Sequence, residues 1–181
     1  MRWSKLKELI ERNFATSVAG RVELHSTHYR GAHDQMGRAW LTIDKKEVFS
    51  FCTLTEIRRS ALLATELREI NRCLDFRDPS QSQAYYSAGY QATALLQRQG
   101  IYSQGDFYVA IHKYLAMPVE EALQSDNEII RSLAILDRRV GKRRLRQLAS
   151  NETDHPLMKL VLAFRCTAEK LNIGQQQSDH R

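Results

Sequence analysis

Three histidines lie close together in the first quarter of the chain, and histidine is a common general base and metal ligand. His25, His28 and His33 fall within nine residues, followed by Asp34. His25 and His28 are three residues apart on a predicted strand, so they point to opposite faces and cannot readily share a metal ion. His33 and Asp34 fall in a predicted loop, where functional residues often lie. The catalytic candidates are His25, His33 and Asp34, and Glu23 could orient one of the imidazoles for hydrolysis.

A block of arginines and lysines near the C-terminus is the second candidate site. It supplies six positive charges within nine residues, with no acid among them: Arg138, Arg139, Lys142, Arg143, Arg144 and Arg146. The rest of the chain has 21 bases and 21 acids, so the net charge of +6 is local. Arg138 and Arg139 fall in the last turn of one predicted helix, where positive charge is favourable. Lys142 and the residues after it open the next predicted helix, where positive charge is mildly unfavourable. Such a corner could bind phosphates or an acidic protein surface. The alternative is a solvated corner that Asp137 and nearby glutamates partly neutralise.

An aromatic sheet face is the third candidate. Alternating patterns predict antiparallel strands over 21–29, 38–44 and 47–53, with a tight turn at Lys45-Lys46. If the small aliphatic residues share one face, the other face gathers Tyr29, Trp40, Phe49 and Phe51 near His25. Such a face could hold a base, a peptide or a small ring. We expect instead that helices cover it, because the C-terminal half has much apolar helical surface to bury.

Helical periodicity predicts a helix over 3–15 and an all-helical chain after residue 53. Asp126 to Leu136 matches Asp154 to Phe164 at an offset of 28 residues, each copy with an aspartate as the predicted helix cap. Short stacked helices show such periods, and the pair weakly resembles HEAT-type repeats, which serve as docking surfaces. The predicted class is α+β. The predicted regions are an α+β core over 1–117, a repeat-like helical region over 118–174 and a flexible tail over 175–181, within one compact domain.

Several features limit the function classes. The sequence contains no nucleophile elbow or phosphate-binding loop. Its three cysteines, Cys52, Cys73 and Cys166, are widely spaced in apolar runs, which is typical of buried thiols in a reducing compartment. No apolar run is long enough for a bilayer, and the N-terminus has the pattern of an amphipathic helix rather than a signal peptide. We therefore expect a cytoplasmic protein with no metal, cofactor or membrane partner. The oligomeric state stays open.

Motifs spread over nearly the whole chain carry a resemblance. They include Arg2-Trp3-Ser4-Lys5-Leu6, Gly37-Arg38-Ala39-Trp40 and the stretch from Leu136 to Arg143. In these the chain resembles a family of uncharacterised bacterial proteins of similar length. The resemblance implies no activity, cofactor or catalytic residues.

The sequence thus favours a non-enzymatic binding or adaptor protein that engages an acidic partner through its basic helix corner. A nucleic-acid-binding protein that uses the same corner is one alternative. A hydrolase with a His/Asp site beside the strands, using His25 or His33 with Asp34, Asp44 or Glu23, is the other.

Overall fold

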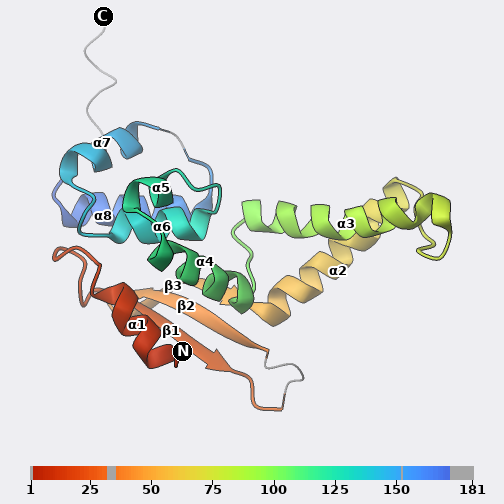
Figure 1. Ribbon diagram of the computed structural model, residues 1–181, viewed down its shortest axis with the longest axis horizontal. Coiled ribbons are helices and arrows are strands. Elements are labelled where there is room, and N and C mark those ends of the chain that lie inside the picture. Colours follow the sequence, from red (N-terminus) through yellow and green to blue (C-terminus); the bar gives the residue numbers. More distant parts are fainter. Residues whose placement is uncertain (1, 32–35, 152, 172–181) are drawn as a thin grey trace, which may run out of the picture. The chain divides into compact units, whose positions relative to one another are not determined.

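A computed structural model describes residues 2–31, 36–151 and 153–171. The chain forms two compact units (Figure 1). Unit 1 combines 1–26, 40–49 and 107–181, and unit 2 combines 27–39 and 50–106. The fold is α+β, as predicted: a helix, a three-stranded sheet, and then helices to the end of the described chain. None of the helices in these ranges is long and apolar enough to cross a membrane.

The three strands are β1 (Val22–His28), β2 (Gly37–Ile43) and β3 (Lys46–Cys52), in the order β1-β2-β3. Asp44 and Lys45 join β2 to β3, and both have positive φ angles, 49° and 66°. Two positive φ angles define the type I′ turn, whose twist suits a two-residue hairpin. The turn therefore lies one residue earlier than the predicted Lys45-Lys46 turn.

The outer edge of β1 is closed by a side chain. The backbone N–H of Asp44 donates to the carbonyl of Arg21, so the odd-numbered residues of β1 hydrogen bond to β2. The N–H of Leu24 therefore points to the edge, where it donates to Glu11 Oε1 at 2.8 Å. Glu11 ends helix α1 (Trp3–Glu11). Occupying an edge N–H in this way reduces unwanted strand pairing.

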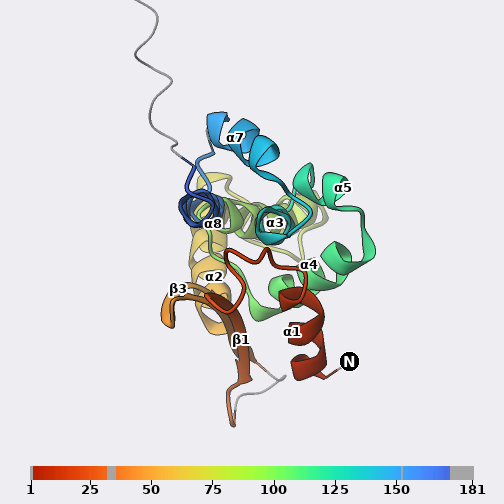
Figure 2. The same ribbon diagram turned by 90° about the vertical axis from the view of Figure 1, so that its left-hand side faces the viewer.

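One helix of unit 1, α6 (Glu128–Leu136), is mostly buried. The other helices of this unit are α1, α4 (Gln104–Ala116, from Phe107 onward), α5 (Val119–Leu123), α7 (Lys142–Ser150) and α8 (Pro156–Ala168). Seven of the nine residues of α6 are buried. Helix α6 packs against α5 and α8 (Figure 1). Helix α7 packs against α8 (Figure 2). The two segments that match at an offset of 28 residues therefore fall on α6 and α8, which lie in contact.

The predicted caps of these two helices are wrong by one residue. The side chain of Asn127, not Asp126, accepts the N–H groups of Ile129 and Ile130 at 3.0 and 3.1 Å. Helix α8 starts at Pro156, whose fixed φ suits the first helical position, and His155 takes the cap position instead of Asp154. Both cap positions lie one residue later than predicted, so the offset of 28 residues between the two helices is unchanged.

Unit 2 contains two long helices side by side, α2 (Thr53–Ile70) and α3 (Pro79–Arg98) (Figure 1). Asp78 caps α3 by accepting the N–H of Ser80 at 2.8 Å, and Pro79 follows as the first helical residue. The predicted boundary after residue 117 does not coincide with the division into units, which places α5 to α8 with α1. The tail predicted over 175–181 lies outside the described residues.

Candidate functional site

The basic corner consists of Arg138, Arg139, Lys142, Arg143, Arg144 and Arg146, all within unit 1. Helix α6 ends at Leu136, so Arg138 and Arg139 lie beyond it rather than in its last turn as predicted. The cause is an extended backbone at Asp137, which forms an antiparallel bridge with Phe14. The N–H of Arg138 also donates to the carbonyl of Asn13 at 2.8 Å. Pairing with the segment after α1 thus stops the helix.

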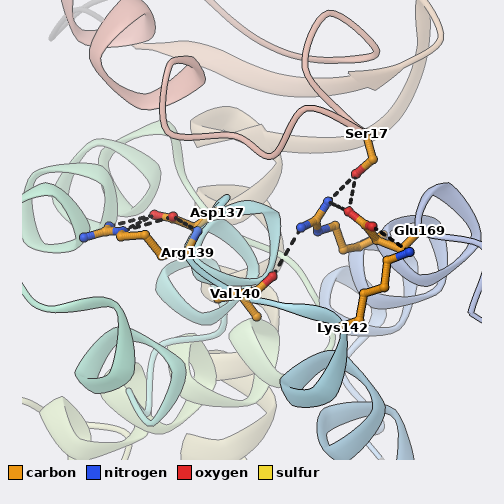
Figure 3. A network of polar contacts seen from close by, with 7 residues as sticks. Ser17, Asp137, Arg139, Val140, Lys142 and Glu169 are labelled. Carbon is orange, nitrogen blue, oxygen red and sulfur yellow. Dashed lines mark hydrogen bonds and ion pairs between the residues drawn. The ribbon is translucent and has the colours of Figure 1, made fainter.

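Arg139 is held by a buried carboxylate (Figure 3). Asp137 is 0% exposed, and Arg139 donates to it from Nε at 3.0 Å and from Nη2 at 2.7 Å. The Tyr114 hydroxyl donates to the same carboxylate at 2.5 Å, and the backbone N–H of Arg139 at 2.8 Å. Burial alone would raise the pKa of Asp137, but these donors outweigh burial and lower it. The same environment raises the pKa of Tyr114, through burial first and Asp137 second. Asp137 is therefore ionised, and Arg139 is tied to it.

A second network holds Lys142 (Figure 3). Its ammonium lies 3.7 Å from Glu169, just after α8. Glu169 also accepts Arg165 Nη1 at 2.6 Å and the Ser17 hydroxyl at 2.6 Å. Arg165 is only 3% exposed and also donates to the carbonyl of Val140 at 3.3 Å. Lys142 thus shares its acid with a buried arginine.

The remaining corner residues differ in whether they are paired. Arg144 lies 3.5 Å from Glu120 of α5. Arg138, Arg143 and Arg146 are exposed and make no ion pair within the described ranges. Together with Arg165, the six bases of the corner face three paired acids, which leaves four net positive charges. We call Arg138, Arg143 and Arg146 the exposed arginines.

The end of the N-terminal helix brings one more base, Arg12, into the chain segment beside the corner, which the sequence did not suggest. The end of α1 lies against the corner because Asn13 accepts the N–H of Arg138. Arg12, the neighbour of Asn13, is exposed and has no ion pair in the described part of the chain. It stands far from the basic block in sequence, so charge patterning along the chain could not reveal it.

The histidine candidate does not form a relay. His25 Nε2 lies 3.0 Å from the Thr42 hydroxyl and 3.7 Å from Glu23 Oε2, and its ring stacks on Trp40 with centroids 5.1 Å apart. A relay needs the nucleophile on one ring nitrogen and the orienting acid on the other, whereas here one nitrogen faces both. Burial first and Lys7 second lower the pKa of His25.

Of the other predicted catalytic groups, Asp44 is engaged by a different side chain. Asp44 is bound by Arg21 at 2.8 and 2.7 Å, so it is not available to the histidine. His33 and Asp34 lie outside the described residues. Among the described residues, no three His, Cys, Asp or Glu side chains form a group that could hold a metal ion.

The predicted aromatic face is divided. Trp40 and Phe49 are half-buried, whereas Phe51 is 1% exposed and packs on Tyr102. Tyr29 follows β1, and its backbone N–H still donates to the carbonyl of Met36 at 2.8 Å. Its hydroxyl lies 3.4 Å from Cys52 Sγ.

The fold and the corner define an α+β protein with a short sheet, a buried α6–α8 pair and a basic junction between α6 and α7. The chain belongs to the SF0329 protein family, whose model matches residues 2–166. No curated protein and no solved structure matches it.

Proposed function

We propose that this is a non-enzymatic binding or adaptor protein that engages an acidic protein surface through the exposed arginines. The main support for this proposal is that these three guanidinium groups take no part in the ion pairs that hold the rest of the corner. An arginine engages carboxylates through two parallel donors, which suits an acidic protein surface.

An acidic protein suits the corner better than nucleic acid. The affinity for duplex DNA changes with salt with a slope of about −0.9 per neutralised phosphate. Three exposed arginines would give a slope near −3, about half of that for six bases, and correspondingly weak binding. Arg139, Lys142 and Arg144 are already paired with Asp137, Glu169 and Glu120. These three bases are therefore less available to a phosphate backbone.

We also propose that the protein works in the bacterial cytoplasm. Its three cysteines are unpaired, and Cys73 and Cys166 are buried, which fits a reducing compartment. The α6–α8 pair extends the proposal, because repeat-like stacked helices commonly serve as docking surfaces. It lies next to the corner in the chain and packs against α7 through α8.

The test compares two triple variants of equal charge. R138E/R143E/R146E and the control K5E/R30E/R98E each bring the net charge from +6 to zero, and all six positions are exposed. The probe is a fluorescent peptide rich in glutamate and aspartate, measured by anisotropy. We expect the corner variant to lose about tenfold or more in affinity, from roughly 0.5 kcal/mol for each of three pairs. The control should stay within about twofold.

A second probe, a short fluorescent DNA duplex, separates the two kinds of partner. Binding of the duplex but not of the peptide would replace the acidic protein with nucleic acid. Equal losses in the corner and control variants would reject the corner, because bulk charge would then explain the binding.

A further inference from the structure

Helix α2 of unit 2 is unusually exposed for its length. Only Ala64 among its 18 residues is buried. Its partner α3 adds Ala88, Ala92 and Leu96 in 20 residues. Helices of this kind gain most of their stability by packing an apolar face. The pair of helices therefore buries little, and side chains of α2 remain in solvent.

One face of α2 carries opposite charges on the two sides of Leu62, which is 67% exposed. Arg58 and Arg59 precede it by four and three residues, and Glu66 and Glu69 follow it by four and seven. At 3.6 residues per turn these five side chains share one face, whereas Ala64 lies on the opposite side. The four charged residues are exposed and make no ion pair within the described ranges. The face is thus basic on one side of Leu62 and acidic on the other.

We propose that this face binds a second copy of the same chain, with the two α2 helices antiparallel and Leu62 opposite its counterpart. In a two-fold antiparallel pair, residues before Leu62 meet residues after Leu62 in the other copy. Arg58 and Arg59 of one chain then lie beside Glu66 and Glu69 of the second copy, and the same pairs form twice. The two Leu62 side chains at the centre of this interface become buried against each other.

The charge pattern favours a second copy over another occupant. A uniformly acidic or basic partner would be attracted by one half of the face and repelled by the other. The chain itself carries +6, so two copies repel each other in general. An antiparallel arrangement of α2 offsets this repulsion locally, because Arg58 faces Glu66 of the second copy and Arg59 and Glu69 lie next to this pair.

Charge exchange tests the arrangement directly, with sedimentation velocity over a concentration series as the readout. R58E/R59E makes all four charges acidic, and E66R/E69R makes all four basic. Each variant alone should raise the dimer dissociation constant by about tenfold or more, because four attractive pairs become repulsive. The two variants mixed should form a heterodimer. The quadruple variant R58E/R59E/E66R/E69R keeps the net charge of +6 and should dimerise like the wild type.

Several results would overturn the proposal. The wild type could stay monomeric throughout the series, or the two double variants could dimerise as tightly as the wild type. Failure of the mixture and of the quadruple variant to associate would also reject the antiparallel register. All four positions are exposed, so circular dichroism should show unchanged helix content, and the mixture controls for any variant that folds poorly.

Discussion

Replacing Asp137 with alanine should destabilise unit 1 more than any change among the exposed bases. The carboxylate accepts hydrogen bonds from four donor groups: the Tyr114 hydroxyl, the backbone N–H of Arg139 and two guanidinium nitrogens of Arg139. Its removal leaves the Tyr114 hydroxyl buried without its partner, which costs about 1–3 kcal/mol. Loss of the ion pair adds to this, although Arg139 can turn to water. We expect a total of about 3–5 kcal/mol for D137A.

Urea unfolding followed by tryptophan fluorescence gives the measurement. Both tryptophans, Trp3 and Trp40, lie in unit 1, so their emission reports this unit. Y114F should cost about 1–2 kcal/mol, because the carboxylate keeps its other donors. R138A is the control for these variants of the buried network, and it should change stability by less than about 0.5 kcal/mol. A cost below about 1 kcal/mol for D137A would refute the reasoning, since the buried network would then contribute little.

The pH dependence gives an independent check on the same residue. The pKa of Asp137 is lower in the folded protein than in the unfolded chain. Its stabilising contribution is therefore present above the unfolded pKa, near 4, and is lost as the pH falls through the folded pKa. The wild type should lose stability more steeply than D137N as the pH falls below about 4. Parallel pH profiles would show that Asp137 ionises alike in both states.

Two further substitutions or modifications have clear expected results. G37A should cost about 1–3 kcal/mol in urea unfolding, because a Cβ there would lie 2.2 Å from the carbonyl oxygen of Thr27. G105A, whose nearest neighbour would be at 3.4 Å, should be neutral or slightly stabilising. Iodoacetamide should modify Cys52 faster than Cys166 at neutral pH, as mass spectrometry would show. Burial opposes ionisation of Cys52, but hydrogen bonds outweigh it and lower its pKa, whereas burial raises the pKa of Cys166. Equal rates would contradict the difference in pKa.

The regular elements could be predicted because their signals are local. The strand predicted over 38–44 is Gly37–Ile43, and the helix predicted over 3–15 is Trp3–Glu11. Side-chain alternation and helical periodicity are read within one segment, so they need no tertiary information. The end of α6 was missed because it depends on Phe14, far away in the chain. The cap positions were missed by one residue because neighbouring polar residues compete for that role.

The sequence shows where the basic corner lies, but it does not show which of its bases are paired with acids and which are exposed. Six bases in nine residues are visible directly, and partial neutralisation by Asp137 and nearby glutamates was the alternative to a binding role. Which bases are neutralised depends on Glu120 in α5 and Glu169 after α8. These acids reach the corner only through helix packing, which spacing does not determine.

Burial explains why neighbouring residues in the corner differ in role. Asp137 has no contact with water, so an unpaired charge there would be costly, and Arg139 is tied to it at 2.7 Å. Arg138 differs by one position, but its backbone is engaged by Asn13 while its side chain points to solvent. A base that is already paired with a buried acid gains little binding energy from a carboxylate of a partner protein. A solvated arginine loses little on binding, because its charge is screened until a partner arrives. The exposed arginines can therefore change without loss of the fold, and the family motif from Leu136 to Arg143 combines a structural clamp with part of a proposed binding surface.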